Sequence, residues 1–425
     1  MNIGIIGGGL SGISLQYYLK HPSIILEKNN NIGGLCRTFE KQGFYYDIGG
    51  HALFSKDKQI MNTINTVLSD NFHFCKRINK ILFKNKYVKY PFENELSTLN
   101  KEDTFDCLFN FIENEFKSYS NFEEWIYYTF GKGIADRYLI PYNKKIWKTS
   151  LNKMNTEWVD RIPKPPLEDI IKSAIGINTE GYVHQLNFGY PKYGGIQSLV
   201  TAFCKNNLDI KTNYCVTNIK KNNNKWIISN GLEKNEFDKL VITAPIIDLL
   251  KYIDNVPSDI IDAANRLKYN TIRVVMIGIN NDSLMDKSCI FIPDENILTH
   301  RICFMGYFSK NNVPEGKSSL IAEITSPINS DIYNMSNDNI IENVVNGLSQ
   351  INIINKNDII VTDCMLEQYG YVIPNNNYRE DLNKIKSYTD FIGIYLLGRF
   401  GEHDYINMDQ VLMRSCRLAT HLNTY

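Results

Sequence analysis

The sequence predicts an α/β fold with an inserted helical block and a separate antiparallel sheet. Three observations lead to this prediction. Residues 1–27 read as a strand, a glycine-rich turn, a helix and a second strand; residues 97–180 have the periodicity of amphipathic helices; and residues 271–325 hold several short β-segments. With 43% hydrophobic and 22% charged residues among 425, the composition is that of a globular protein of about two to four domains.

Composition and charge exclude several classes of function. Lys+Arg and Asp+Glu number 46 each, so no overall basic field attracts nucleic acid or an anionic membrane. The nine cysteines form no CxxC pair and no cluster with metal-ligand spacing, which predicts reduced thiols, no metal site and a cytoplasmic location. The chain shows neither a membrane-length apolar run nor the basic start of a signal peptide. The sequence leaves the oligomeric state open, with a homo-oligomer as one alternative.

The N-terminal segment predicts a dinucleotide site. A buried strand at Ile3–Ile6 leads into a GxGxxG pattern at Gly7, Gly9 and Gly12, and a helix and a second strand follow. Gly7 permits the tight turn, Gly9 lets a pyrophosphate approach the backbone at the positive helix end, and Gly12 lets the helix pack on the strand. The second strand ends at Glu27, where an acidic side chain would hold a ribose hydroxyl.

A second glycine pair favours FAD over NAD. Residues 33–38 read Gly-Gly-Leu-Cys-Arg-Thr and follow Glu27 closely. The pair resembles the flavoprotein pattern in which a second loop meets the FAD phosphates, and a simple NAD dehydrogenase does not need it. We therefore expect a Rossmann-like FAD-binding domain.

The middle of the chain predicts helices that interrupt this domain. Phe105, Leu108, Phe109 and Ile112 have the spacing of one apolar helix face, and residues 122–130 repeat it. We also expect residues 158–165 and 176–187 to be loops that are mobile without substrate and close over it, because Pro163, Pro165 and Pro166 bound the first of them and prevent a helix there.

The later segments predict a return to the first domain and then a β-sheet. A hairpin is expected at 214–219 and 226–228, and a buried strand at 239–245 re-enters the nucleotide-binding domain. Segments 271–279, 289–293, 301–308 and 319–325 are spaced like an antiparallel sheet. A strand at 395–399 and a helix from Asp409 close the first domain. The predicted division is residues 1–75, 190–250 and 390–425 for FAD binding, 97–189 for the helical substrate domain, and 76–96 and 251–389 for the antiparallel sheet.

Several blocks together resemble one family. The blocks are Tyr46–Ser55 around a Gly-Gly-His, Tyr90–Asn94, Gly131–Asp136, Pro141–Trp147, Gly398–Gly401, Tyr405 and Met408–Gln410. They resemble UDP-galactopyranose mutases, mostly the eukaryotic type, with a more bacterial C-terminal end. They occur in the family's order over nearly the whole chain.

The resemblance implies an isomerase of a nucleotide sugar. These enzymes interconvert pyranose and furanose forms without net redox change, yet they require reduced FAD, whose N5 is a covalent nucleophile. The best-matching substrate is UDP-galactopyranose, and galactofuranose would serve cell-surface polysaccharide biosynthesis. NADPH or NADH could act as reductant.

The resemblance also implies roles for individual residues. Catalytic positions are His51 at the flavin edge, and Arg161 and Arg301 on the diphosphate, where guanidinium groups suit phosphate oxygens. Substrate contacts are implied for Tyr90, Phe92, Asn143, Trp147, Tyr307, Tyr371 and Tyr405. FAD contacts are implied for Gly7, Gly9, Leu10, Ser11, Gly12, Glu27, Gly34, Leu35, Arg37, Gly49, Gly50, Val216, Gly398, Arg399, Met408, Asp409 and Gln410.

Three departures from the family leave the substrate open. Glu93 stands where the family usually has Gln, and Phe291 and Phe308 stand where eukaryotic members have tyrosines, although Tyr307 is adjacent. Glu93 places an acceptor-only group near the base. Uracil offers one N–H, whereas guanine offers an N–H and an amino group, so the substrate need not be UDP-galactose.

Two other functions remain as alternatives. An amine-oxidase-type FAD oxidoreductase or desaturase shares the Gly7–Gly12 and Gly33–Thr38 patterns, but it needs an apolar substrate tunnel and no diphosphate arginines. The third hypothesis is a flavin-binding paralogue that has no enzymatic turnover.

Overall fold

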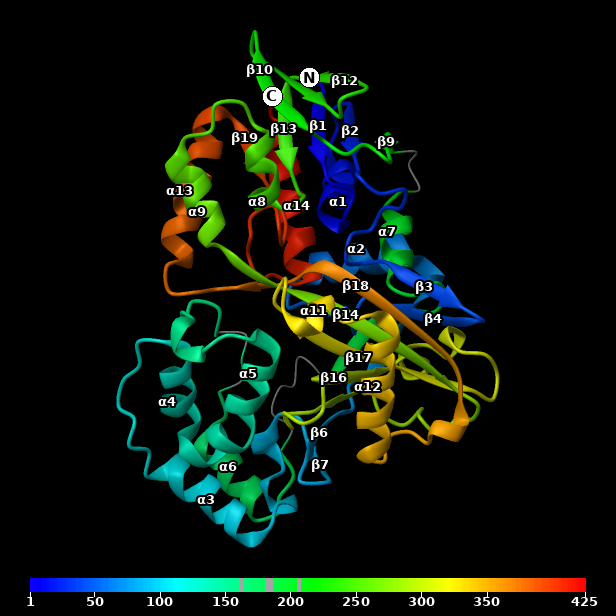
Figure 1. Cartoon of the computed structure of the whole chain (residues 1–425), viewed down its shortest axis with the longest axis vertical. Helices are drawn as coiled ribbons and strands as arrows, with labels where there is room; N and C mark the ends of the chain where they lie inside the picture. The colour runs from blue at the N-terminus through cyan, green and yellow to red at the C-terminus, as the bar shows by residue number, and fades with distance from the viewer. Residues whose placement is uncertain (160–161, 163, 180–185, 205–207) are drawn as a thin grey trace.

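The computed structural model describes residues 1–159, 162, 164–179, 186–204 and 208–425. It confirms the predicted fold class. A parallel sheet lies at the top of Figure 1, a long antiparallel sheet crosses the middle and lower right, and a helical block lies at the lower left.

The parallel sheet is built from strands far apart in the sequence. Its order is β19-β13-β1-β2-β9, and every neighbouring pair is parallel. The strand bounds are β1 Ile3–Ile6, β2 Ser23–Leu26, β9 Ile210–Lys211, β13 Lys239–Ile242 and β19 Ile394–Leu396. All four residues of β1 are buried, as expected for a parallel strand covered on both faces.

Both ends of the chain cover this sheet. Helix α1 (Leu10–Tyr18) packs against the C-terminal helix α14 (Met408–Leu422), and α7 (Gln197–Phe203) lies beside α1. A three-stranded sheet contacts strands β1 and β13 of the parallel sheet, and its own strands are β10 Asn218–Asn222, β11 Lys225–Ser229 and β12 Lys234–Phe237. The predicted hairpin is therefore present, although its first strand begins four residues later than expected because residues 214–217 lie outside the regular ladder.

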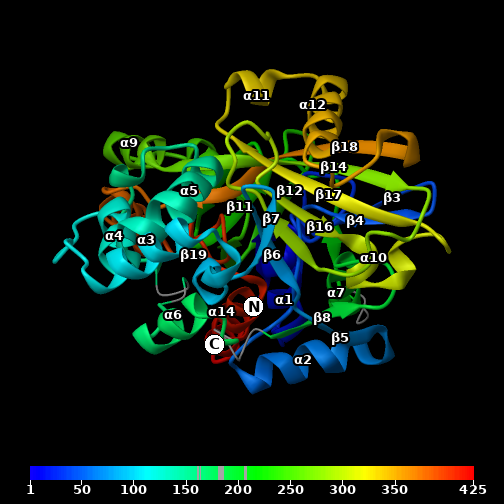
Figure 2. The ribbon, with the colours of Figure 1, turned by 90° about the horizontal axis from the view of Figure 1, so that it is seen from below.

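The antiparallel sheet has seven strands in the order β18-β14-β17-β16-β15-β6-β7. Their bounds are β6 Asn79–Phe83, β7 Lys86–Lys89, β14 Lys268–Ile279, β15 Cys289–Phe291, β16 Arg301–Phe304, β17 Ser318–Ser326 and β18 Ile359–Ile373. Only the β15–β6 pair is parallel. Helix α12 (Asn337–Gln350) covers one face (Figure 2). The expected β-segment 301–308 ends early, because residues 305–308 form the short helix α10.

The helical block contains α3 (Lys101–Ile112), α4 (Phe122–Ile134), α5 (Ile140–Trp147) and α6 (Leu167–Ala174). A π-helical turn at Ala135–Leu139 joins α4 to α5. The periodicity located α3 correctly, but its Phe105, Phe109 and Ile112 side chains are 62%, 49% and 50% exposed. The predicted apolar face of α3 is therefore largely on the surface, and Cys107 provides its buried contact.

The remaining elements connect these three parts. They comprise two antiparallel two-stranded sheets, β3 Thr38–Lys41 with β4 Phe44–Asp47 and β5 Phe72–Lys76 with β8 Asn187–Pro191, and the helices α2 Lys58–Leu68, α8 Ile246–Leu249, α9 Ser258–Arg266, α11 Asp331–Asn334 and α13 Tyr378–Ile392. None of the helices in the described ranges is long and apolar enough to span a bilayer.

Candidate active site

One cavity of about 750 Å³ runs between the three parts of the fold. Its walls include the turn after β1, the end of β2, the β14 and β18 strands of the antiparallel sheet, and helix α5. Ligands of open α/β sheets bind beyond the carboxyl ends of the parallel strands, and the turn after β1 is such an end. The cavity therefore starts where the sequence predicts a dinucleotide.

The glycine-rich turn forms a cradle at that end. Gly9 is the N-cap of α1, and no side chain caps the helix, so its first N–H groups face the cavity. The second loop approaches closely: the Gly33 N–H donates to the Gly8 carbonyl at 2.8 Å, and a Cβ on Gly34 would lie 3.2 Å from the Gly9 Cα. Side chains at these glycines would fill the space left for phosphates.

Glu27 holds the shape of this cradle. Its carboxylate accepts from the Gly8 N–H at 2.7 Å and from the Asn29 N–H at 2.9 Å, and the residue lines the cavity while 8% exposed. Arg37 donates to the Gly34 carbonyl and forms an ion pair with Glu367 of β18. The uncapped helix end, the two glycine loops and the cavity-facing carboxylate fit an FAD.

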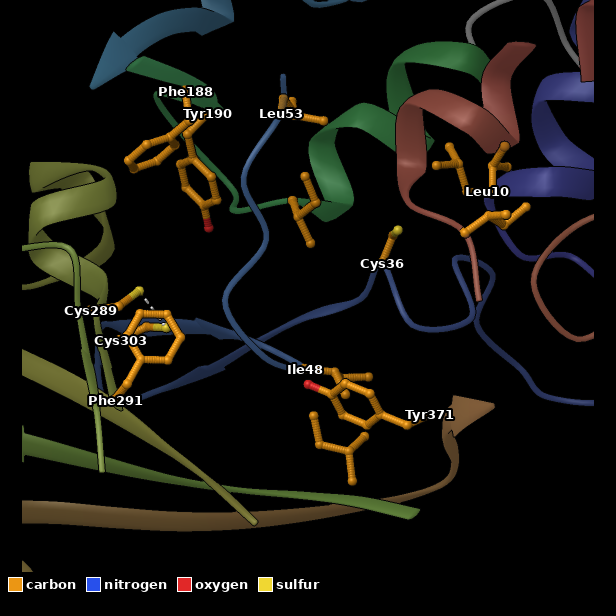
Figure 3. Packing of buried hydrophobic residues seen from close by; sticks show 14 of the residues in the cluster. Leu10, Cys36, Ile48, Leu53, Phe188, Tyr190, Cys289, Phe291, Cys303 and Tyr371 are labelled. Atoms are coloured by element: carbon orange, nitrogen blue, oxygen red, sulfur yellow. Dashed lines mark hydrogen bonds between the residues drawn. The ribbon is translucent and has the colours of Figure 1, made fainter. Parts of the chain in front are cut away.

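The Gly-Gly-His segment lines the next part of the cavity. Gly49 has φ +94°, and a Cβ on Gly50 would lie 2.4 Å from the Cys303 Sγ. Cys303 is paired across the strands with Cys289, and their sulfur atoms are 2.9 Å apart (Figure 3). Only glycine allows the backbone to pass this close to β16.

His51 is neutral in this environment. Burial, followed by the charges of Arg301 and Arg399, lowers its pKa to about 3. Its Nδ1 has no hydrogen-bond partner in the described part of the chain and lies 4.0 Å from Asp47 Oδ2. A neutral imidazole facing the cavity can hydrogen-bond a ligand, but it is not a strong base at that pKa.

Arg301 enters the cavity from the start of β16. Its Nε donates to Glu323 Oε1 at 2.8 Å and its Nη2 to Glu323 Oε2 at 2.6 Å, a bidentate pair. Glu323 is fully buried and also accepts from the Gly50 N–H at 2.9 Å. One carboxylate thus fixes both the arginine and the Gly-Gly-His backbone.

Aromatic side chains line the wall beyond Arg301. Tyr371, Tyr405 and Trp147 form a cluster with ring centroids 5.3 to 6.2 Å apart, and the Arg399 guanidinium lies 4.5 Å from the Tyr405 centroid. The Trp147 indole N–H donates to Asn143 Oδ1 at 3.1 Å. These rings exclude water from the middle of the cavity, while their polar ends can meet a ligand.

Glu93 and further aromatic residues form the far end. Tyr90 stacks on Phe291 with centroids 4.7 Å apart, and Tyr138 also faces the cavity. Glu93 lies in the one-turn helix Phe92–Asn94, is 3% exposed and lines this end. Burial raises its pKa to about 7.

Most predicted site residues reach the cavity. Those that line it are Gly7, Gly9, Leu10, Ser11, Glu27, Gly34, Leu35, Arg37, Gly49, Gly50, His51, Tyr90, Asn143, Trp147, Val216, Arg301, Tyr371, Arg399, Tyr405 and Met408. Arg161 lies outside the described residues, as do residues 160, 163 and 180–185 of the two expected loops.

Phe92 and Tyr307, two of the predicted substrate contacts, do not line the cavity. Phe92 is fully buried between Phe83 and Tyr138, behind the cavity wall, because the one-turn helix directs its ring into the core. The Tyr307 hydroxyl donates to the Lys76 carbonyl at 2.8 Å, so this hydroxyl already has a partner outside the cavity.

Four other predicted FAD contacts lie close to the cavity without being part of its lining. Gly12 packs against the Gly7 carbonyl, and a Cβ on Gly398 would lie 2.0 Å from Ser11 Oγ. Gln410 accepts from the Asn407 N–H as part of the α14 capping box, and Asp409 lies in the first turn of that helix. None of these four lines the cavity.

The sequence did not lead us to predict Glu323 and His300 as residues of the site. His300 lines the cavity, is 1% exposed, and has no hydrogen-bond partner for either ring nitrogen in the described ranges. Burial, followed by the Arg301 charge, lowers its pKa. A signal for Glu323 was available, since an acid inside the apolar run Leu320–Ile324 requires a buried partner.

Comparison with known proteins identifies the family. The sequence profile of the flavin containing amine oxidoreductases matches residues 10–365, and the chain belongs to this family. The putative protoporphyrinogen oxidase from Exiguobacterium shares the fold, with a TM-score of 0.80 and 12% identity over 100% of this chain and 98% of that one. The family supports a flavoprotein that binds FAD.

The resemblance to UDP-galactopyranose mutases is also confirmed. A crystal structure of reduced UDP-galactopyranose mutase matches with a TM-score of 0.91 and 26% identity, covering 99% of this chain and 95% of that one. The mutase of Mycoplasma pneumoniae is 22% identical over 53% of this chain and 58% of its own length. The L-amino-acid oxidase of Sistrurus catenatus edwardsii is 24% identical over 56% and 48%. The chain thus spans about half the length of these two curated relatives.

The buried carboxyl of Glu93 predicts an unusual pH dependence of stability. Because its pKa is about 7 in the folded chain against 4.5 in an ordinary setting, the folded state holds a proton that the unfolded state releases. Its contribution to the free energy of unfolding therefore falls as pH rises from about 4.5 to 7, by about 3 kcal/mol. We expect Glu93→Gln to raise the unfolding midpoint at pH 8 and to change it little at pH 5, without added nucleotide. Equal effects at both pH values would contradict this account.

Proposed function

We propose that the chain is a flavin-dependent mutase that interconverts the pyranose and furanose forms of the sugar in a nucleoside diphosphate sugar. The observation that carries the proposal is Arg301, held in bidentate geometry by a fully buried carboxylate and directed into the cavity between the FAD cradle and the aromatic end. A fixed guanidinium at this place suits a diphosphate. The similarity to UDP-galactopyranose mutases supports it and makes UDP-galactopyranose the first substrate to test.

In the proposed mutase reaction, each of these residues has a separate role. Reduced FAD, when bound, supplies the nucleophile that attacks the anomeric carbon. Arg301 stabilises the charge of the departing diphosphate, and the hydroxyls of Tyr371 and Tyr405 donate to its oxygens. Trp147 and its neighbours exclude water, which would otherwise compete for a reactive sugar. His51, neutral at physiological pH, orients the cofactor by hydrogen bonding and does not act as general base.

The proposal extends to the surroundings of the enzyme. The substrate is a nucleotide sugar, and nucleic acid and membrane are not ligands. NADPH or NADH reduces the flavin in a cytoplasmic setting, and the furanose product feeds the synthesis of surface polysaccharides. A homo-oligomer is compatible with this function.

Amine or amino-acid oxidation is the second candidate, favoured by the family. It predicts consumption of oxygen with an amine substrate. Four arginines, Arg37, Arg77, Arg301 and Arg399, line the cavity, and a cavity with these guanidinium groups suits an anionic ligand better than a cationic amine. We therefore rank it below the mutase.

A redox-controlled assay separates these functions. We expect the dithionite-reduced, FAD-loaded enzyme to convert UDP-galactopyranose, or another nucleotide sugar, to its furanose form without consuming reductant. The oxidised enzyme is expected to be inactive. Chromatography of the nucleotide sugars and the ratio of NADPH oxidised to product measure this. Turnover by oxidised enzyme, or one reductant oxidised per product, would contradict the mutase; hydrogen peroxide formed with an amine would establish the oxidase.

A further inference from the structure

The far end of the cavity holds a buried acid without a cation. Glu93 is 3% exposed, yet no lysine, arginine or histidine of the described ranges lies within 4.0 Å of its carboxylate. No side chain among those ranges donates a hydrogen bond to it either. A buried carboxylate that has only its own backbone N–H beside it is costly to ionise, so we infer that this site uses the carboxylate when a ligand is bound.

Aromatic rings line the same end of the cavity as this carboxylate, and the Arg77 guanidinium lies 5.4 Å from the centroid of the Tyr90 ring. Tyr90, Tyr138 and Phe291 line the same end, and the Tyr90 and Phe291 rings are stacked with an interplanar angle of 20°. Flat aromatic walls favour a flat ring as ligand. Strands β6 and β7, which precede Glu93, lie at the opposite end of the molecule from β1 and β2 in Figure 1. A flat ligand at this end would therefore lie far from the glycine cradle. Arg301 lines the same cavity as both.

A nucleobase is the flat group that a nucleoside diphosphate sugar provides, and this step rests on the function proposed above. An ionised carboxylate has only acceptors, so both oxygens are satisfied only by two neighbouring N–H donors. Guanine presents such a pair, N1–H and the N2 amino group. Uracil and thymine present one N–H between two carbonyl oxygens, and adenine and cytosine present an amino group beside a ring acceptor.

We propose that Glu93 selects the nucleobase and that the substrate of this site is a guanosine diphosphate sugar. Oε1 and Oε2 of Glu93 accept from guanine N1–H and N2–H, while the base lies against Tyr90. A glutamine at this position would offer one donor and one acceptor, which match uracil instead.

Nucleotide binding tests the proposal directly. Dissociation constants of GDP, UDP, CDP and ADP are measured by calorimetry on the FAD-loaded enzyme at pH 8, where the carboxylate is ionised. We expect GDP to bind roughly 5- to 150-fold more tightly than UDP, the range of one bidentate base contact. Glu93→Gln is expected to remove this preference and to favour UDP. Glu315→Gln changes the same charge at an exposed position and is expected to keep the wild-type ranking.

The outcomes separate the two proposals. A wild-type enzyme that prefers UDP, or ranks all four equally, overturns the role of Glu93 and leaves the mutase function standing. A Glu93→Gln variant that is folded and yellow but still prefers GDP also overturns it. If none of the four diphosphates binds, the mutase proposal falls as well.

Discussion

Arg301→Ala is expected to lose most turnover while the protein keeps its FAD. Two hydrogen bonds to Glu323 fix this guanidinium at the cavity wall. Removal of a charged hydrogen-bond partner costs about 1.5–3 kcal/mol, or roughly 10- to 150-fold in rate. Steady-state kinetics with reduced enzyme, and flavin absorbance per protein, measure the two effects.

The same substitution is also expected to lower stability, because it leaves Glu323 buried without its cation. The penalty for breaking a buried pair is about 3–5 kcal/mol. In Arg301→Ala/Glu323→Gln the buried charge is gone, while an amide oxygen can still accept from the Gly50 N–H. This double variant is expected to regain stability and to stay inactive.

A surface arginine provides the control. Arg379 pairs with Glu157, and both side chains are nearly half exposed, so Arg379→Ala is expected to change turnover and stability little. Wild-type kinetics in Arg301→Ala would refute the diphosphate role. Loss of FAD in that variant, together with loss of turnover, would make Arg301 a structural residue.

The cofactor end was predictable from sequence because its determinants are local. Gly7, Gly9 and Glu27 lie within one strand–turn–helix–strand unit, and its geometry follows from residue spacing alone. The aromatic residues beyond Arg301 were predicted only from the resemblance of motifs, which identified Tyr371 and Tyr405 as site residues without explaining how they pack.

The errors arose where a side chain's direction depends on tertiary pairing. Glu323 faces Arg301 because β16 and β17 pair in that register, and the register is not encoded near either residue. Phe92 and Glu93 are adjacent, but the one-turn helix sends the first into the core and the second into the cavity. On α3, periodicity identified the helix without indicating which face the rest of the protein would cover.

Gly12→Ala is expected to abolish FAD binding. A Cβ at Gly12 would lie 2.1 Å from the Gly7 carbonyl oxygen, which is a backbone atom of the cradle itself. No rotamer change can relieve this contact, so α1 must move away from β1, and the uncapped N–H groups at its start leave the phosphate position. We expect colourless protein with a lower unfolding midpoint.

Gly347→Ala separates this clash from the general effect of replacing a helical glycine. Gly347 lies inside α12, where a Cβ would meet Ile297 at an ordinary 3.6 Å, so this variant is expected to be neutral or to gain up to about 1 kcal/mol. Flavin absorbance and thermal unfolding of the two variants, measured side by side, give the comparison. If Gly12→Ala retained full FAD occupancy, α1 could shift without disturbing the cradle, and the tight contact with Gly7 would not be what shapes the phosphate site.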